Sequence, residues 1–446
     1  MKQEIKTSTL LLLLLLALMT GVVLGALTNV RHSSYTISQK SLPATEKIEY
    51  LIKLADKSYV DSIDNDSTVD RLCSSILSAL DPHSRYLSEK EMRREMESLR
   101  GNFEGIGVVL HPKGDTTCAG QIIEGGPAEH AGVLAGDRIL LIDGTPVVGK
   151  STSEIIPMLR GERRSKVIVT VLRPSDGKLR DIEIKRDVIK TNSLAYSCMV
   201  DKQTGYIRLT QFSHTTYAEF CDAVKQLKRQ GMKRMVLVLR DNGGGALEAA
   251  LDICDELLPR RELIVYTEGV HQRRKEYHSK PGGLFCEGDL IVMIDEFSAS
   301  ASEIVAGAVQ DNDRGKIVGR HSFGKGLVQQ QFQLPDNSSV LLTVSRYYTP
   351  SGRCIQRSYD KGSDEYYSDF IERVMEGDEK DSVLVALTDT TPYHTAKGRI
   401  VYGGGGIYPD HVIHYKTDTN AIYYNMLVNK GLFSESAFDI VTTQGM

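Results

Sequence analysis

Residues 290–329, LIVMIDEFSASASEIVAGAVQDNDRGKIVGRHSFGKGLVQ, decide the fold of this chain. The apolar run 290–294 has the length and β-branched content of a buried strand, and the small residues 298–302 precede helical spacing over 303–310. A serine in such a strand-to-helix turn has an exposed hydroxyl. The backbone N–H groups of the first helical turn point toward negative charge developing beside it. This arrangement suits acyl transfer, and we interpret Ser300 as a nucleophile.

The same stretch offers two candidates for the base that a serine nucleophile needs. A hydroxyl is a weak nucleophile until a neighbouring base takes its proton. His321 and Lys325 are both available, and Lys325 lies between two glycines at the start of a strand-like run. A lysine that acts as a base must be neutral, and lowering its pKa from about 10.4 to about 7 costs roughly 4–5 kcal/mol. Only an apolar, largely dry site supplies that free energy. We favour Lys325 over His321.

The segment SASASE, followed by the lysine of FGKG and then by Gln329, resembles the serine peptidases of the C-terminal processing, or tail-specific, family. The resemblance implies that Ser300 is the nucleophile, Lys325 the general base and Gln329 the residue that orients the lysine. Residues four apart on a strand share a face, so Lys325 and Gln329 are compatible in space. A single serine in this turn, taken alone, would be interpreted as a helix cap. The three residues together favour catalysis.

Composition sets broad limits on function. The chain has 446 residues, 41% of them hydrophobic and 25% charged, which indicates a globular protein of two or three domains. Its net charge of −4 gives no reason to expect nucleic acid as a partner. The seven cysteines lack CxxC spacing, and the eleven histidines include no HExxH motif. We therefore expect no metal and no other cofactor.

The N-terminus carries an apolar stretch, TLLLLLLLALMTGVVLGAL, at residues 9–27. It is uncharged and long enough to span a membrane as a helix, and Lys2 and Lys6 before it place the short N-terminus in the cytoplasm. The alternative is a signal peptide cleaved near Gly25 and Ala26. Either way we expect an exported protein of the cell envelope, with its bulk in the periplasm or otherwise outside the cytoplasm.

Residues 28–102 follow as a helical region. Ser88 and Glu91 form a capping-box signature, and Gly101 is a stop signal. The sequence LDPHSRYLSEKE at 80–91 is also typical of the tail-specific family. This region could support packing or self-association into a homo-oligomer, but we assign it no chemistry.

Residues 103–188 contain short apolar alternations between glycine turns, including GPAEHAG and GDRILLIDG. They resemble the PDZ modules inside C-terminal processing peptidases. In such modules a loop donates backbone N–H groups to a peptide's terminal carboxylate while the peptide adds as a strand to the sheet edge. Here that loop is Ile106, Gly107 and Val108, and the expected partners are proteins or peptides with free C-terminal tails.

Residues 189–416 alternate strands and helices, and we expect them to form the peptidase core. A glycine-rich loop follows the apolar run 235–239, but it lacks the Lys-Ser/Thr of a phosphate-binding loop. The family instead has an LRxNPGG segment here, which implies an oxyanion hole made by the N–H groups of Gly244 and Ala301. Gly243 replaces the usual proline, which leaves the choice between Gly244 and Gly245 open.

The remaining segments complete the prediction. Residues 358–400 are polar and predict a surface insertion, and 417–446 predict a helical tail. Asp311 and Asp313 are interpreted as a solvated helix end. The predicted fold class is multidomain α/β: a helical N-terminal region, a PDZ domain, and an α/β crotonase-like serine peptidase core.

The predicted function is a serine endopeptidase that cuts exported proteins near their C-termini after its PDZ domain engages the tail. One alternative is a catalytically inactive PDZ-bearing binding or scaffold protein on a peptidase fold. A second is an acyl-CoA-type transformation, because crotonase-like folds share paired oxyanion donors. The PDZ module and the lysine argue against the second.

Overall fold

The structure is a computed structural model, and it describes residues 15–23, 43–376, 391–414, 422–429, 431–433, 435–437 and 440. The chain divides into two compact units, Met1–Arg71 and Leu72–Met446. The segment 9–27, predicted to be a membrane anchor or signal peptide, lies outside the described residues except for a helix over 15–23. Within the described part of the chain, no helix is both long and apolar enough to cross a membrane.

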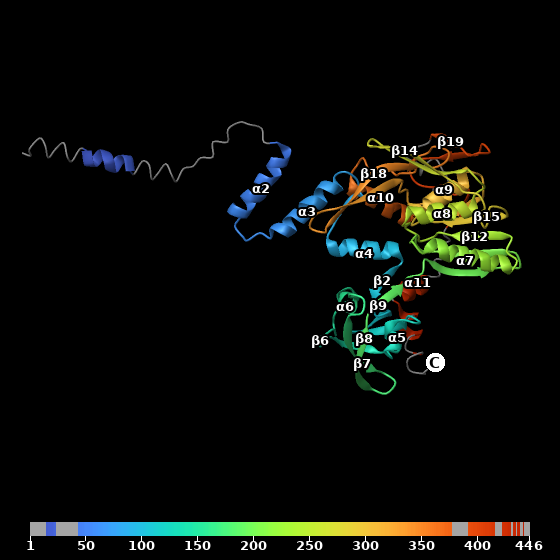
Figure 1. Ribbon diagram of the computed structural model, residues 1–446, viewed down its shortest axis with the longest axis horizontal. Helices are drawn as coiled ribbons and strands as arrows, with labels where there is room; N and C mark the ends of the chain where they lie inside the picture. The colour runs from blue at the N-terminus through green and yellow to red at the C-terminus, as the bar shows by residue number, and fades with distance from the viewer. Residues whose placement is uncertain are drawn as a thin grey trace, which may run out of the picture. The chain divides into compact units, whose positions relative to one another are not determined.

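The N-terminal part of the chain is helical, as its sequence pattern predicts. Its helices are α2 (Ala44–Ser58), α3 (Asn65–Ser78) and α4 (Glu89–Arg100) (Figure 1). Helix α4 begins with the predicted capping box, in which the backbone N–H of Ser88 donates to the carboxylate of Glu91. It ends at Gly101, whose left-handed backbone (φ 70°) suits glycine.

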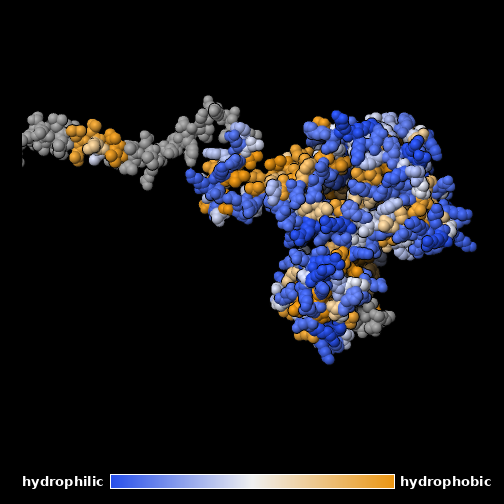
Figure 2. All heavy atoms as spheres, viewed as in Figure 1, coloured by the Kyte–Doolittle hydropathy of each residue, from blue (hydrophilic) through white to orange (hydrophobic). Residues whose placement is uncertain are grey.

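Helix α2 exposes its apolar side chains. Ile48, Leu51 and Leu54 recur three residues apart, and they are 42%, 54% and 44% exposed. Figure 2 shows hydrophobic residues at the surface of this helix. No described residue of 44–71 is buried. The apolar side chains whose spacing predicts the helix are therefore not buried in a core of the first unit.

Residues 102–190, the region expected to be a PDZ domain, form an antiparallel sheet with two short helices. The strand order is β3-β4-β5-β7-β8, with β6 paired to β5. The strands are β3 (Val108–Lys113), β4 (Thr116–Ile122), β5 (Arg138–Ile142), β6 (Thr145–Pro146), β7 (Lys166–Arg173) and β8 (Lys178–Lys185). The helices are α5 (Pro127–His130) and α6 (Thr152–Leu159). The two ends of the region meet in a separate antiparallel pair, β2 (Asn102–Gly105) and β9 (Asp187–Lys190).

The larger core is built on a six-stranded sheet in the order β10-β11-β12-β15-β16-β21. The strands are β10 (Leu194–Met199), β11 (Thr204–Leu209), β12 (Arg234–Val238), β15 (Asp289–Ile294), β16 (Lys316–Gly319) and β21 (His411–Val412). The neighbours from β11 to β21 are parallel, and β10 is antiparallel to β11. Three helices pack with the sheet: α7 (Thr216–Arg229), α8 (Leu247–Leu257) and α9 (Ala301–Asp311). Strand and helix alternate along the chain, as parallel pairing requires.

A second sheet joins distant parts of the chain. Its strands follow the order β1-β18-β13-β14, and β17 also pairs with β18. They are β1 (Arg85–Leu87), β13 (Leu263–Gly269), β14 (Gln272–His278), β17 (Leu327–Gln333) and β18 (Ser339–Tyr348). Because β1 pairs with β18, the 80–91 segment belongs to this core although it is far away in sequence.

The predicted insertion and tail contain further short elements. Helix α10 (Ser363–Glu376) and the strand pair β19 (Pro392–His394) and β20 (Ile400–Tyr402) lie within or just beyond 358–400. Helix α11 (Ile422–Asn429) lies in the predicted C-terminal tail. The predicted insertion is therefore partly helical.

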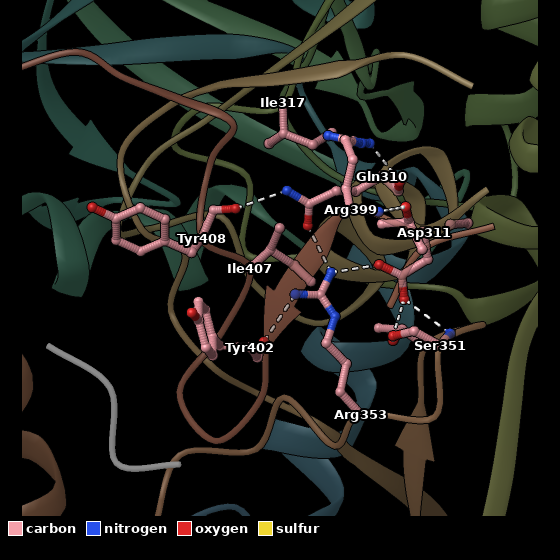
Figure 3. A network of polar contacts seen from close by, with 12 residues as sticks. Gln310, Asp311, Ile317, Ser351, Arg353, Arg399, Tyr402, Ile407 and Tyr408 are labelled. Carbon is pink, nitrogen blue, oxygen red and sulfur yellow. Dashed lines mark hydrogen bonds and ion pairs between the residues drawn. The ribbon is translucent and has the colours of Figure 1, made fainter. Parts of the chain in front are cut away.

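A buried ion pair fixes the C-terminal end of α9 (Figure 3). The guanidinium of Arg353 donates to the carboxylate of Asp311 at 2.7 Å and to the side-chain oxygen of Gln310 at 2.6 Å. Both charged side chains are 0% exposed. The other oxygen of Asp311 accepts from the N–H and hydroxyl of Ser351. Each charge is therefore paired and hydrogen-bonded, as burial of an ion pair demands.

This network corrects one sequence prediction. Asp311 and Asp313 do not form a solvated helix end, because Asp311 is fully buried with Arg353 and Asp313 is paired with Arg399. The cationic partners come from chain segments 42 and 86 residues away, and nothing in the local pattern shows them. The prediction was wrong because it treated a long-range pairing as a local one.

We predict that Asp311→Asn lowers the free energy of unfolding by about 3–5 kcal/mol, because it leaves the buried Arg353 without a charge partner. The chain has no tryptophan, so urea unfolding followed by circular dichroism is the suitable measurement. Asp176→Asn is the control, since Asp176 pairs with Arg180 at the surface and its loss should leave the transition in place. Equal transitions for the two variants would contradict the role of the buried pair.

Candidate active site

Two turns meet at the carboxyl ends of the neighbouring strands β12 and β15. The strands run parallel with Val238 opposite Met293, so the turns that follow them lie at the same edge of the sheet. The first turn carries Gly244 (φ 96°) and the second carries Ser300. A Cβ on Gly244 would lie 2.9 Å from the Cβ of Ser300 and 2.9 Å from the amide nitrogen of Ala301. Only glycine fits there, and the glycine-rich loop packs directly against the serine turn.

The three serines of SASASE have different surroundings. The hydroxyls of Ser298 and Ser302 are fully buried, and they donate to the carbonyl oxygens of Leu239 and Asn242, each at 2.8 Å. These two bonds tie the serine turn to the segment after β12. Ser300 instead lines a cavity of about 900 Å³. The structure therefore places only the middle serine where a substrate could reach it.

The backbone of Ser300 is strained. Its φ of 54° and ψ of −111° lie in a region that residues other than glycine rarely adopt. The residue sits between the end of β15 and the first residue of α9, so the turn presents its hydroxyl at the edge of the sheet. Such strain costs about 1–3 kcal/mol and persists only where the surroundings hold it.

Lys325 and Gln329 line the same cavity as Ser300. The Nζ of Lys325 donates to the Oε1 of Gln329 at 3.0 Å, and the amide of Gln329 donates to the carbonyl oxygen of His83. His83 belongs to the 80–91 segment, whose loop is fixed by bonds to the carboxylate of Asp81. That family-like segment therefore holds the partner of the lysine.

Burial lowers the pKa of Lys325, and the nearby guanidinium of Arg85 lowers it further. The carboxylates of Glu95 and Glu303 act in the opposite direction. A lowered pKa favours the neutral amine that a general base requires. In this structure the amine is bonded to Gln329, and no hydrogen bond joins it to the Oγ of Ser300.

The carboxylate of Glu303 joins the serine turn to the lysine loop. One oxygen accepts from the backbone N–H groups of Ser300 at 2.8 Å and of Lys325 at 2.9 Å. The other accepts from the hydroxyl of Ser322 at 2.5 Å and the N–H of Gly324 at 2.8 Å. Burial raises the pKa of Glu303 to about 7, while the four donors favour the ionised form. A single buried side chain thus joins the backbone of Ser300 to that of Lys325.

Tyr347 makes a second connection between the same two segments. Its buried hydroxyl lies 3.2 Å from the carbonyl oxygen of Ser300 and 2.5 Å from that of Lys325. The carboxylate of Glu303 accepts from the backbone N–H groups of these two residues, and the hydroxyl of Tyr347 donates to their carbonyl oxygens. Together they contact the backbone of both residues through its N–H groups and its carbonyl oxygens.

Sequence reasoning missed Glu303, Tyr347 and Arg85 as parts of the site. For Glu303 a signal was present, because Ser300 and Glu303 have the S-x-x-E spacing of a capping box, and the N–H of Ser300 donates to the carboxylate of Glu303 as in such a box. For Tyr347 and Arg85 there was no local signal, since strand pairing alone brings Tyr347 to the cavity and Arg85 close enough to Lys325 to lower its pKa.

The predicted oxyanion donors differ in their surroundings. Ala301 is the first residue of α9, so its N–H has no carbonyl partner within the helix. The N–H of Gly244 donates to the side-chain oxygen of Asn242 at 3.0 Å. Gly245 also lines the cavity. An oxyanion that uses Gly244 would have to displace the Asn242 contact.

His321, the alternative base, lies elsewhere. It is buried, its ring contacts the guanidinium of Arg373, and it does not line the cavity with Ser300. Burial holds the pKa of His321 well below its usual value. Among the described residues, no group of three or more His, Cys, Asp or Glu side chains is arranged to hold a metal ion.

The three predicted peptide-binding residues lie together at the start of β3. Gly107 has a φ of 78°, which suits glycine, and Ile106 is buried. Bonds from the N–H groups of Ala128 and Ile123 to the carbonyl oxygens of Ile106 and Gly107 fix the loop. Strand β3 is the end strand in the described sheet order, so no described strand pairs with its outer edge.

Comparison with known proteins identifies both larger regions. Residues 203–362 match Peptidase family S41, and residues 119–173 match the PDZ domain. The Carboxy-terminal-processing protease of Bartonella bacilliformis is 36% identical over 343 residues, which are 75% of this chain and 78% of that protein. The Carboxy-terminal processing protease CtpA of Bacillus subtilis is 31% identical over 363 residues, which are 80% of this chain and 76% of that protein.

A solved photosystem II D1 C-terminal processing protease is 30% identical, and the match covers 69% of this chain and 83% of that chain with a TM-score of 0.40. The predicted fold class, a multidomain α/β protein with PDZ and peptidase domains, is confirmed by the two domain matches. The chain belongs to the carboxy-terminal-processing proteases of peptidase family S41, with an internal PDZ domain.

Proposed function

We propose that this protease is a serine endopeptidase that uses a Ser300–Lys325 dyad. The observation that carries the proposal is that Ser300, the lysine and Gln329 line one cavity while Glu303 bridges the two backbone segments. Ser300 has a strained, presented hydroxyl, and the pKa of Lys325 is lowered. These are the properties that a nucleophile and its base require.

In the first half of the reaction, the Nζ of Lys325 takes the proton of Ser300 Oγ, which attacks the peptide carbonyl carbon. The tetrahedral intermediate collapses with cleavage of the C–N bond, and the lysine gives the proton to the leaving amine. Water then attacks the acyl-enzyme, Lys325 takes its proton, and Ser300 Oγ recovers a proton as the acid leaves. Before the reaction the amine of Lys325 is bonded to Gln329, and it must turn toward Ser300 for the first proton transfer. The proposed role of Gln329 is to orient the amine for this turn.

The oxyanion of the intermediate would be stabilised by the N–H of Ala301 and an N–H of the glycine-rich loop. Ala301 contributes an unpartnered amide of the first helical turn. In the loop, Gly244 packs against Ser300 but donates to Asn242. Gly244 is retained as the second donor, and Gly245 is the alternative from the same loop.

The substrates proposed for this protease are exported proteins or peptides with free C-terminal tails, cut near those tails. Ile106, Gly107 and Val108 would bind the terminal carboxylate while the tail pairs along the open edge of β3. Export rests on the apolar stretch 9–27, which would act as a membrane anchor or signal peptide. Self-association into a homo-oligomer would use the helical region.

The domain division proposed from the sequence stands as part of this account: 1–27, 28–102, 103–188, 189–416 and 417–446, with a surface insertion at 358–400. The pairing of β2 with β9 supports the boundaries near 103 and 188, because it brings the two ends of the PDZ region together. A domain whose ends meet can be inserted into a longer chain without disturbing the flanking parts.

We predict that Ser300→Ala and Lys325→Ala each lower kcat for an unfolded substrate with an apolar C-terminus by a factor of about 10³ or more, because each removes half of the dyad. Activity is measured on protein lacking residues 1–27, with circular dichroism as the check on folding. Full activity in folded Lys325→Ala would rule out the dyad. Wild-type protein that binds tails without cutting them would favour the scaffold alternative.

The same assay tests the PDZ part of the proposal. Amidation of the substrate's C-terminal carboxylate should weaken binding to the wild-type protein, because the loop of Ile106 to Val108 would lose its charged partner. Unchanged binding of the amidated substrate would argue against carboxylate capture.

We also predict that Arg85→Gln shifts the rising limb of kcat/KM to higher pH. The guanidinium of Arg85 lowers the pKa of Lys325, whereas the carboxylate of Glu95, which is paired with Arg85 at 3.5 Å, raises it. The substitution removes the cation and leaves Glu95 without its partner, and both changes raise the pKa of Lys325. A base with a raised pKa becomes neutral only at higher pH. Arg93→Gln, which removes an exposed cation paired with Glu89 on α4, is the control and should leave the limb in place. A limb that stays fixed in Arg85→Gln would contradict Lys325 as the titrating base.

A further inference from the structure

Strand β14 presents positive charge to the cavity that holds Ser300. Alternate residues of a strand point to one face, and Arg273, Lys275 and Tyr277 all line this cavity. The register places Lys275 opposite Thr267 of β13, which lines the cavity as well. One face of the β13–β14 hairpin therefore forms a wall of the proposed active site.

The cations on the two faces of β14 have different surroundings. On the other face, Arg274 is paired with Glu276 at 2.8 Å and lies over the ring of Tyr266 at 3.7 Å. On the cavity face, Lys275 lies 4.8 Å from the ring of Tyr277. In the chain as the structure describes it, neither Arg273 nor Lys275 forms an ion pair. Two cations thus face the cavity without a carboxylate of the protein to neutralise them.

The carboxylates that line the cavity already interact with other groups. Glu95 of α4 is paired with Arg85 at 3.5 Å. Glu248 lies in the first turn of α8, where the helix dipole favours a negative charge. Neither forms an ion pair with β14 in the described structure. The cations of the cavity face therefore remain available to a negative group of a bound ligand.

We propose that Arg273 and Lys275 form a subsite that selects an acidic side chain of the substrate close to the cleaved bond. The proposal rests on the proposed peptidase function, since the ligand is the peptide that Ser300 attacks. A guanidinium binds a carboxylate through two parallel N–H groups, and an ammonium adds a second charged donor. Such contacts favour an acidic residue over its neutral amide isostere.

The effect should be moderate and sensitive to salt. Both cations are exposed, so each contact with a carboxylate is screened by solvent and ions. Exposed pairs of this kind are expected to give a preference of about threefold to tenfold for two cations together. The preference should decline as ionic strength rises, because the Debye length falls to about 3 Å at 1 M salt.

The test uses two sets of tailed peptides that differ only by a single glutamate or glutamine, moved one position at a time across the cleaved bond. Protein lacking residues 1–27 should cut the glutamate peptide about threefold to tenfold faster, as kcat/KM, at one or two positions. Arg273→Gln/Lys275→Gln should abolish that ratio, and Arg273→Glu/Lys275→Glu should reverse it. Arg274→Gln removes one charge from the opposite face of the same strand, so it should keep the wild-type ratio.

The inference and the function on which it rests fail in different ways. Equal rates for the two peptide sets with wild-type protein, or a wild-type preference that survives in Arg273→Gln/Lys275→Gln, would overturn the acidic subsite. Loss of the preference in Arg274→Gln to the same extent would also overturn it, because net charge alone would then explain the result. Cleavage of neither peptide set would overturn the proposed peptidase function itself.

Discussion

The buried carboxylate of Glu303 is the constraint on which the proposed site depends. It accepts four hydrogen bonds, two of them from the backbone of Ser300 and Lys325, which are 25 positions apart in sequence. A carboxylate without such partners would not stay ionised in a buried place. The donors therefore stabilise Glu303, and Glu303 in turn fixes the strained serine turn against the lysine loop.

The rest of the core serves to keep that connection in place. The parallel pairing of β12 and β15 brings the glycine-rich loop to the serine turn, and the buried Arg353–Asp311 pair fixes the far end of α9, the helix that carries Glu303. Strand β1 adds Arg85 to the surroundings of the lysine. The amine of Lys325 donates to Gln329 and not to Ser300, so the two residues of the proposed dyad line one cavity without a hydrogen bond between their side chains.

Much of the fold, but only part of the candidate site, could be predicted from the sequence. The apolar run 290–294, the small residues after it and the alternation of strands and helices predict the parallel core. A strand that is buried on both faces appears in the sequence as a continuous apolar run. Ser300 was predicted from the strand-to-helix turn and Lys325 from the bases near it, and the family resemblance added Gln329. Tyr347 and the cations of β14 come to the cavity, and Arg85 to the surroundings of Lys325, through strand pairing, which no local pattern encodes. The burial of Asp311 was missed for the same reason.

The most direct test of the central claim is the reactivity of Ser300 in Glu303→Gln, measured as the rate of labelling by a serine-directed acylating reagent alongside kcat for a tailed peptide. A glutamine offers one acceptor oxygen and places an NH₂ group against N–H donors, so the connection is broken at a cost of about 1–3 kcal/mol. The account predicts a folded protein in which labelling and kcat both fall by roughly 5- to 150-fold. Folded protein with wild-type labelling and turnover would contradict it.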